Sequence, residues 1–477
     1  MSQPEVFQPH RPKVVSNVVR GCLGNLVEWF DWFVYASFSI YFAKAFFPAE
    51  NLTAQLLSTA VVFAVGFLMR PLGGWVLGIY ADKFGRRAAL TLSVTLMSAG
   101  SLAIALTPGY ATIGVIAPVI LVLARLLQGL SVGGEFGSSA TYLAEVATPG
   151  KRGFFSSFQY VSIVLGQLTA LLVMIVLQSL LTDEQMYSFG WRSPFAVGAI
   201  AGLVVMYLRR SMEESEHFEV EKALELAAAA KGEPKVKKGL WALITQYPKQ
   251  LGIVFALAIG GTVAFYTFTT YLQKYMVNTA GIPKETAAVI NFAALFLFML
   301  LQPVAGALSD RIGRKPIMFF FSIGLCLLTV PIMTLLGNTN NPWVAFGLMS
   351  FALVFVTGYT ALAAIIKAEM FPTKVRALGV GLPHALVAAT FGGTSETIAL
   401  ALKQAGIEST YFWYVTGCIF LTFIATIFVK ESSKTSTLEL LPKEEAEAVA
   451  ETTELVAHST SSTTATITRN SGSGPNL

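Results

Sequence analysis

Four ionisable side chains lie deep inside long apolar stretches of the sequence. Glu28 and Asp31 are three residues apart, so a helix places both on one face together with Tyr35. Arg70 and Arg125 lie in two further apolar stretches. Because an ionisable group in hydrocarbon is costly, each one is by default a candidate functional residue. Carboxylates and guanidinium groups at this depth have the chemistry to bind a proton and an organic anion.

These four charges allow two interpretations. In the first, Glu28 and Asp31 neutralise the two arginines and hold the helices together. In the second, a carboxylate takes up a proton and releases its arginine, whose guanidinium then binds a substrate carboxylate through two hydrogen bonds. We favour the second, because it makes proton and anion binding depend on each other. Asp31 is preferred as the proton carrier over Glu28, and Glu135 is a third candidate.

The composition indicates which elements position these residues. Of 477 residues, 54% are hydrophobic and 13% are charged, and the mean hydropathy is +0.62. This excludes an ordinary soluble protein. A helix needs roughly 20 apolar residues to span a bilayer, and twelve such stretches fit between residues 18 and 430. Long apolar runs rather than short alternating segments exclude a β-barrel. The predicted fold is an all-α polytopic membrane protein with 12 transmembrane helices.

A long polar connection divides these stretches into six and six. The predicted organisation is a cytoplasmic N-terminus (1–17), an N-terminal six-helix lobe (18–210), a cytoplasmic linker (211–248), a C-terminal six-helix lobe (249–430) and a disordered cytoplasmic tail (431–477). Most of the 33 Lys and Arg residues fall in connections on the side of the two termini. The positive-inside rule therefore places both termini in the cytoplasm.

Two short motifs occur once in each half of the sequence. One has an aspartate and an arginine four residues apart, around a glycine (Gly85 or Gly313) that suits a tight turn with positive φ. The other has a glutamate and an arginine seven residues apart, around a proline. Both recur at nearly the same offset, which indicates two homologous six-helix halves. We interpret them as a cytoplasmic gate whose ion pairs form and break, although they could serve only to orient the helices in the membrane. The gate candidates are Asp82, Arg86, Glu145, Arg152, Asp310, Arg314, Glu369 and Arg376.

Longer strings resemble a known family. The Gly-x-x-x-Asp-Lys/Arg-x-Gly-Arg-Arg/Lys loop of both halves resembles the signature of the major facilitator superfamily. Residues 24–31, 69–74 and 125–135 resemble its metabolite:proton symporter family, and residues 266–275 and 367–381 are similar to members that carry alpha-ketoglutarate. The resemblance implies two lobes around a midplane cavity, lined mainly by helices 1, 4, 7 and 10.

The resemblance and the depth of the residues together suggest a set of substrate-binding candidates. They are Arg70, Arg125, Gln128, Tyr35, Tyr266, Tyr271, Lys274, Gln302 and Tyr359. Each tyrosine has packing or interface anchoring as an alternative role, and Lys274 is near enough to a helix end to extend its ammonium outward. His384 is interpreted as a packing residue rather than a proton relay.

We therefore predict a transporter of the bacterial inner membrane rather than an enzyme. It would take up alpha-ketoglutarate or a related dicarboxylate together with a proton, as a functional monomer in the lipid bilayer. Alternatives are symport of citrate, shikimate or a proline/betaine-type osmoprotectant, or a non-transporting nutrient sensor. The sequence has no P-loop and no His-Glu-x-x-His motif, so no cofactor, metal or nucleic-acid partner is expected. Gly129, Gly133 and Gly137 form a small-residue stripe that permits close helix packing.

Overall fold

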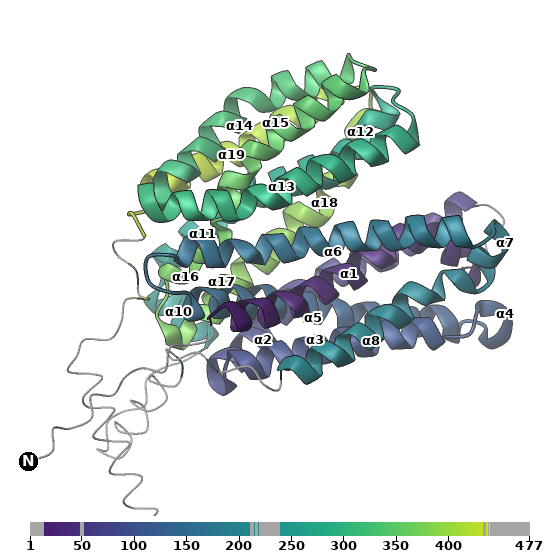
Figure 1. Cartoon of the computed structure of the whole chain (residues 1–477), viewed down its shortest axis with the longest axis horizontal. Helices are drawn as coiled ribbons and strands as arrows, with labels where there is room; N and C mark the ends of the chain where they lie inside the picture. Colours follow the sequence, from purple (N-terminus) through teal and green to yellow (C-terminus); the bar gives the residue numbers. More distant parts are fainter. Residues whose placement is uncertain are drawn as a thin grey trace, which may run out of the picture.

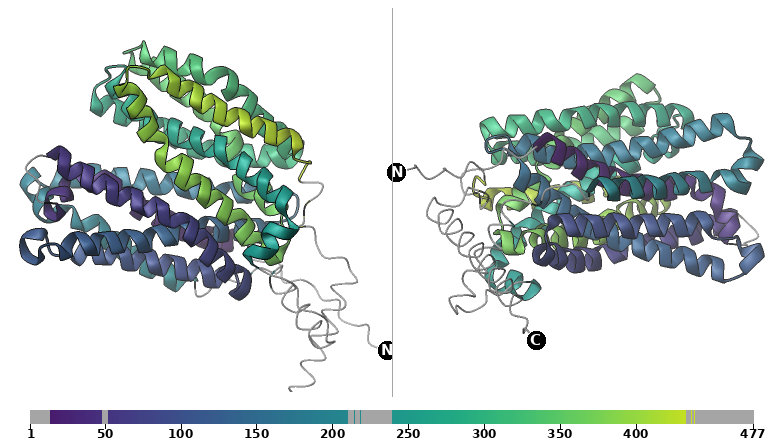
Figure 2. Two further views of the ribbon diagram at one scale, coloured as in Figure 1. Left: turned by 180° about the vertical axis from the view of Figure 1, so that it is seen from behind. Right: turned by 60° about the horizontal axis from the view of Figure 1, so that its bottom comes forward.

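A computed structural model describes residues 14–47, 52–209, 214, 218, 239–432, 436 and 438, and all regular secondary structure among them is helical. Residues 1–13 of the predicted N-terminus (1–17), most of the predicted tail (431–477) and most of the predicted linker (211–248) lie outside the described residues. Figure 1 shows two helix bundles, one formed by each half of the chain. The bundles lie close together where α1 begins and α19 ends, and they diverge toward the opposite end (Figure 2).

The first bundle, called the N-bundle below, contains six long helices. They are α1 (Val14–Phe46), α2 (Leu52–Phe84), α3 (Arg86–Leu106), α5 (Ile116–Val146), α6 (Arg152–Leu180) and α8 (Arg192–Arg209). Short elements α4 (Tyr110–Ile113), α7 (Asp183–Gln185) and the π-turn η1 (Met186–Gly190) connect them at the diverging end. Gly85 separates α2 from α3 with a φ of 103°, as its place in the repeated motif predicts.

The second bundle, called the C-bundle, contains six further long segments, three of them interrupted. They are α11 (Pro248–Tyr266) with η2 (Thr267–Tyr271) and α12 (Leu272–Asn278); α13 (Lys284–Ile312); α14 (Arg314–Gly337); α15 (Pro342–Thr360) with α16 (Ala363–Glu369); α17 (Thr373–Val387) with η3 (Ala388–Gly392) and α18 (Gly393–Gln404); and α19 (Ser409–Phe428). The short α10 (Leu240–Gln246) precedes α11. Gly313 has a φ of 97° at the turn equivalent to Gly85.

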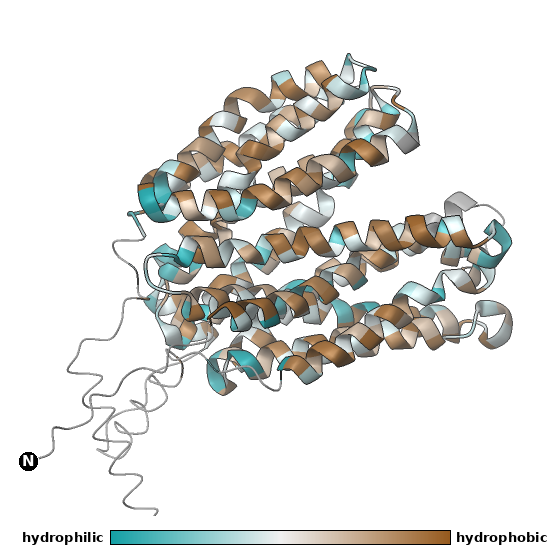
Figure 3. Cartoon of the chain, viewed as in Figure 1, coloured by the Kyte–Doolittle hydropathy of each residue, from teal (hydrophilic) through white to brown (hydrophobic). Residues whose placement is uncertain are grey.

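The surfaces of these helices are those of a membrane protein. Ten helical segments are long and apolar enough to cross a bilayer, or eleven when Asp183–Gly190 and Arg192–Arg209, bent by 44°, count as one span. With α1, the long segments of the described chain number twelve, in agreement with the predicted architecture. Large apolar side chains such as Leu180, Leu327 and Trp343 are mostly exposed. In Figure 3 apolar residues cover the helix shafts and polar residues gather near the helix ends.

Small residues set how closely three helices approach. A Cβ on Gly133 of α5 would lie 2.6 Å from the Cα of Arg70 in α2, and one on Gly129 would lie 3.0 Å from the Cα of Gly66. A Cβ on Gly137 would lie 2.7 Å from the Cα of Gly381, in α17 of the other bundle. The glycine stripe therefore permits the predicted close packing of α5, whose neighbours here are α2 and α17 of the C-bundle. This packing places Arg70 beside the helix that carries Arg125.

Candidate functional site

Charged side chains join the two bundles at the end where α1 begins and α19 ends, called the basic end because its connections carry Lys83, Arg86, Arg87, Lys151, Arg152, Arg311, Arg314 and Lys315. Arg86 contacts Asp82 at 3.0 Å and Glu145 at 3.3 Å, all within the N-bundle. Glu145 also accepts a bond of 2.6 Å from Arg376 of α17. One buried carboxylate thus holds arginines from both bundles.

The second copy of the motif forms an equivalent arrangement. Arg314 contacts Asp310 at 2.7 Å and Glu369 at 3.3 Å. Asp310 in turn accepts the backbone N–H groups of Gly153 and Phe154 in α6 at 2.8 and 2.9 Å. In the first copy, Asp82 accepts the N–H groups of two α17 residues, Ala377 and Leu378, both at 3.2 Å. Each aspartate therefore binds the backbone of the opposite bundle.

Two glutamates that the sequence analysis did not select complete the basic end. Glu214 accepts from the N–H of Arg86, the first residue of α3, at 2.9 Å. Glu431 accepts from the N–H of Arg314, the first residue of α14, at 2.8 Å. A carboxylate at a helix N-terminus accepts hydrogen bonds from the unpaired N–H groups of the first turn and interacts favourably with the helix dipole. Arg152, the remaining gate candidate, donates to the carbonyl of Leu438.

Aromatic rings surround the two arginines at mid-depth. The Cζ atoms of Arg70 and Arg125 each lie 4.2 Å from the ring centre of Trp32, so the two guanidinium groups share this indole. Arg70 Nη1 donates to the hydroxyl of Tyr266 in the C-bundle at 3.1 Å. Both arginines are buried, and the Nε and Nη2 atoms of each lack a hydrogen-bond partner within the described chain.

Arg125 has an amide partner. Its Nη1 donates to Gln128 Oε1 at 2.7 Å, and Gln128 Nε2 donates to Ser101 Oγ at 2.9 Å. The ring of Tyr35 lies 4.3 Å from Arg125 Cζ, and the Tyr35 hydroxyl donates to the carbonyl of Thr59. Gln128 and Tyr35, two of the binding candidates, therefore lie beside the arginine.

The predicted ion pairs between the buried acids and these arginines are not formed among the described residues. Glu28 accepts from the Ser93 hydroxyl of α3 at 2.8 Å, and Glu135 pairs with Arg209 of α8 at 2.8 Å. Asp31 packs against Gly198 of α8, and neither of its oxygens reaches hydrogen-bond geometry. The three acids face α3 and α8 inside the N-bundle, while the arginines face aromatic rings, which is why they do not pair. Asp31 nevertheless lies near Ser101 and within electrostatic range of Arg125.

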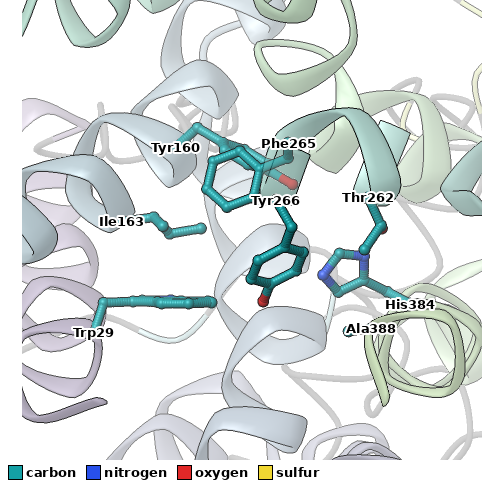
Figure 4. A pocket seen from close by; sticks show the side chains of 8 residues that line it. All are labelled: Trp29, Tyr160, Ile163, Thr262, Phe265, Tyr266, His384 and Ala388. Atoms are coloured by element: carbon teal, nitrogen blue, oxygen red, sulfur yellow. The ribbon is translucent and has the colours of Figure 1, made fainter. Parts of the chain in front are cut away.

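A small pocket lies between the bundles at mid-depth. Figure 4 shows its lining residues, Trp29, Tyr160, Ile163, Thr262, Phe265, Tyr266, His384 and Ala388. The Tyr266 hydroxyl and the His384 ring come from the C-bundle and Trp29 from the N-bundle. Two of the lining residues are next to interruptions of their helices, since η2 begins directly after Tyr266 and η3 begins at Ala388. Single π-turns of this kind are frequent at functional sites.

Lys367, Tyr359 and His384 form a polar cluster beside the pocket, and the sequence analysis did not select its lysine. Lys367 of α16 is buried, and its ammonium lies 3.3 Å from both the Tyr359 hydroxyl and His384 Nδ1. Tyr359 was a predicted site residue, but Lys367 was noticed only as the first residue of the string 367–381 that resembles the family. A lysine within an apolar stretch is the signal that could have identified it.

Among the predicted binding residues, Tyr266 is the one that lines this pocket in the described chain. Three others have their partners elsewhere in the C-bundle. Tyr271 donates to Glu408 at 3.1 Å, and Lys274 pairs with Glu396 with about half of its side chain exposed. Gln302 accepts from Thr360 at 3.0 Å inside the C-bundle. Their partners are in the C-bundle, so each side chain is satisfied away from the other bundle.

Comparisons with known proteins agree with this arrangement. The sequence matches the family described as sugar (and other) transporter over residues 18–444. It is 51% identical to the alpha-ketoglutarate permease of Escherichia coli (strain K12), covering 87% of this chain and 94% of that protein. It is 33% identical to a citrate-proton symporter of Salmonella typhi, covering 87% and 94%. The structure of the proton:xylose symporter XylE bound to 6-bromo-6-deoxy-D-glucose superposes with a TM-score of 0.69 at 19% identity, covering 89% of this chain and 98% of that one.

Two helix bundles with a polar site between them define a multi-pass membrane carrier rather than an enzyme. The chain belongs to the sugar (and other) transporter family of the major facilitator superfamily.

Proposed function

We propose that the protein is a proton-coupled uptake carrier for alpha-ketoglutarate or a related dicarboxylate. It would act as a monomer in the bacterial inner membrane, with the basic end and both termini in the cytoplasm. The single observation that carries the proposal is that Arg70 and Arg125 are buried without an ion pair to any described carboxylate.

This observation favours an anionic substrate. A buried charge without a counter-charge is strongly unfavourable, so an anion that reaches these guanidinium groups gains a large interaction energy. A carboxylate matches the fork of an arginine and can accept two parallel hydrogen bonds. The free Nη2 atom of each arginine is available for such a bond.

A short polar chain supports coupling to a proton. It consists of the hydrogen bonds from Arg125 to Gln128 and from Gln128 to Ser101, and Asp31 lies near its Ser101 end without a hydrogen bond to it. An ionised Asp31 attracts Arg125 toward the N-bundle interior, and a protonated Asp31 leaves the guanidinium to the substrate. Glu135 is less suited to this role because Arg209 already compensates its charge.

Alternating access would depend on the basic end. The Glu145–Arg376 pair and the bonds of Asp82 and Asp310 to the opposite bundle hold this end together. They must break for the substrate to leave toward the cytoplasm. The eight gate candidates would then control the conformation rather than bind the substrate.

Transport in proteoliposomes tests the proposal. We expect uptake of radiolabelled alpha-ketoglutarate to rise when the outside is made acidic and to fall when a protonophore removes the gradient. Unlabelled dicarboxylates should compete more strongly than citrate, shikimate, proline or betaine. Uptake that ignores the gradient would remove the symport assignment, and stronger competition by betaine or proline would remove the anion assignment.

Asp31→Asn tests the proposed proton carrier. The amide keeps the shape of the side chain but cannot bind the proton, so gradient-driven uptake should fall to background while exchange of internal for external substrate continues. Asp183→Asn, an exposed residue of α7 with the same chemical change, should transport normally. If Asp31→Asn still responds to the proton gradient, another group carries the proton.

A further inference from the structure

A second buried cation lies beside the pocket, in the C-bundle, and contacts a residue that lines it. Lys367 is 1% exposed and forms no ion pair with a described carboxylate. Its two polar contacts, with Tyr359 and His384, are both 3.3 Å long, at the weak end of the hydrogen-bond range. An ammonium group has three donors, so the interactions within the chain leave it incompletely satisfied.

Lys367 is in contact with the bundle interface. Its Nζ lies 5.0 Å from the ring centre of Phe136, in α5 of the N-bundle. The His384 ring stacks on the same phenyl group, with ring centres 3.6 Å apart and an angle of 19°. His384 also lines the pocket, as Figure 4 shows. The lysine thus reaches the pocket wall through the imidazole that it contacts.

The cation on the N-bundle side of the pocket is Arg70. Arg70 lies 5.4 Å from the ring centre of Trp29 and donates to Tyr266, and both of these residues line the pocket. His384 is within electrostatic range of both Arg70 and Lys367. The pocket is therefore flanked by one buried cation from each bundle.

We propose that Lys367 binds the second carboxylate of the substrate, while the arginines of the N-bundle bind the first. His384 is then a positioning residue, because a charged ammonium can only donate and Nδ1 must accept from it. This inference rests on the proposed function and adds a determinant of specificity. A substrate with two carboxylates is held by both bundles, and one with a single carboxylate leaves one cation uncompensated.

The position of the cluster also links binding to closure. Lys367 precedes Glu369 of the basic end on the same short helix, α16, and His384 is on α17 with Arg376. A dicarboxylate that bridges Arg70 and Lys367 would pull α16 and α17 toward α2 and α5. A monocarboxylate would lack this effect.

The test compares two ligands on matched variants of the purified full-length protein. Binding of alpha-ketoglutarate and of 2-oxopentanoate, which has a methyl group in place of the distal carboxylate, is measured by calorimetry. In Lys367→Met, alpha-ketoglutarate should bind about 10- to 100-fold more weakly, as for loss of a charged hydrogen bond. Binding of 2-oxopentanoate should be unchanged, and Lys367→Arg should retain part of the preference. Lys403→Met, a lysine of α18 that contacts Glu408 at 3.7 Å, should behave as the wild type with both ligands.

Two further variants address the positioning role and folding. His384→Leu should lower the ratio of the affinity for alpha-ketoglutarate to that for 2-oxopentanoate. His384→Gln, which keeps a hydrogen-bond acceptor, should restore much of this ratio. If His384 has only a structural role, the ratio should not depend on whether the replacement has an acceptor. If Lys367→Met fails to fold, Lys367→Gln and the His384 pair supply the same comparison. Equal weakening of both ligands would overturn this inference alone. No binding of alpha-ketoglutarate by the wild type would overturn the proposed function and this inference with it.

Discussion

Arginines at the basic end and arginines at mid-depth are equally buried, but only those at the basic end contact carboxylates of the described chain. Arg86 and Arg125 are both 0% exposed, so removing either from water has a similar cost. Arg86 contacts two carboxylates, whereas Arg125 contacts an amide and aromatic rings. The difference lies in where the compensating negative charge comes from.

This contrast separates two tasks. At the basic end the negative charge belongs to the chain, and part of it is supplied across the bundle interface, as in the pair of Glu145 with Arg376. Compensation there depends on conformation. At mid-depth no carboxylate of the described residues lies within ion-pair distance of Arg70 or Arg125, and in the proposed function a bound anion compensates them. A mutation at mid-depth should therefore change affinity, and one at the basic end should change the conformational equilibrium.

The largest effect should come from Arg125→Ala. We expect the affinity for alpha-ketoglutarate to fall by about 30- to 5,000-fold, because truncating one partner of a buried charge pair typically costs 2–5 kcal/mol. The melting temperature without ligand should not fall, since the variant removes a buried charge that no described carboxylate compensates. Calorimetry and thermal unfolding in detergent measure the two quantities separately.

Arg192→Ala is the matched control in the same bundle. Arg192 donates to the carbonyls of Ala105 and Thr107 at 2.8 and 2.7 Å, so its loss should lower stability and leave affinity unchanged. If Arg125→Ala instead lowers the melting temperature while ligand affinity survives, the mid-depth arginine is structural and the contrast between the two regions disappears.

The sequence predicts the architecture and the local contacts of the repeated motif, for a physical reason. Long apolar runs specify helices that span a bilayer, and the aspartate–arginine motif is local, so its contacts follow from residues four apart. Asp82–Arg86 and Asp310–Arg314 are both i, i+4 pairs. The sequence could also place Arg70 and Arg125 at mid-depth from their distance to the helix ends.

The partners of buried charges could not be predicted in the same way. Glu28 and Asp31 share a helical face, but Glu28 meets Ser93 of α3 and Asp31 meets Gly198 of α8, which depends on how three helices pack. Nothing in the local pattern around Lys367 or His384 indicates that their side chains meet. The bonds of Glu431 to the first turn of α14 lie in a segment whose composition predicts disorder.

A smaller effect, on conformation rather than binding, should follow Glu145→Gln. The amide keeps the size of the side chain but removes the charge that Arg86 and Arg376 share. We expect the equilibrium to shift toward opening at the basic end by about 1–3 kcal/mol, or about 5- to 150-fold. Hydrogen–deuterium exchange should then accelerate at the start of α17, while alpha-ketoglutarate affinity changes much less than in Arg125→Ala.

Glu408→Gln provides the control at the other end of the C-bundle. Glu408 accepts from Tyr271 and Thr279 and pairs with Lys403. Hydrogen–deuterium exchange in Glu408→Gln should change only in the region around α12. Unchanged exchange of α17 in Glu145→Gln would show that the basic end is held by backbone contacts, such as those of Asp82, and that its ion pairs serve only to orient the helices.

The smallest effects should separate two tyrosines of one helical segment. The Tyr266 hydroxyl accepts from Arg70 at the bundle interface, whereas the Tyr271 hydroxyl donates to Glu408 within the C-bundle. Loss of a single hydrogen bond costs about 0.5–1.5 kcal/mol. Tyr266→Phe should therefore weaken alpha-ketoglutarate binding by about 2- to 13-fold, and Tyr271→Phe should lower stability by a similar free energy without changing affinity.

This pair tests the boundary of the site, since both tyrosines are equally plausible from the sequence. Each change removes one oxygen atom and leaves the ring, so packing is nearly conserved. Calorimetry on the two variants shows which hydroxyl contributes to substrate affinity, and thermal unfolding shows which one contributes to stability. If Tyr271→Phe weakens binding as much as Tyr266→Phe does, the substrate extends along the α11–α12 segment beyond the pocket of Figure 4. The negative charge of Glu408 would then lie near the substrate. The region in which the substrate binds would therefore include a carboxylate of the chain, and it could no longer be defined by the lack of one.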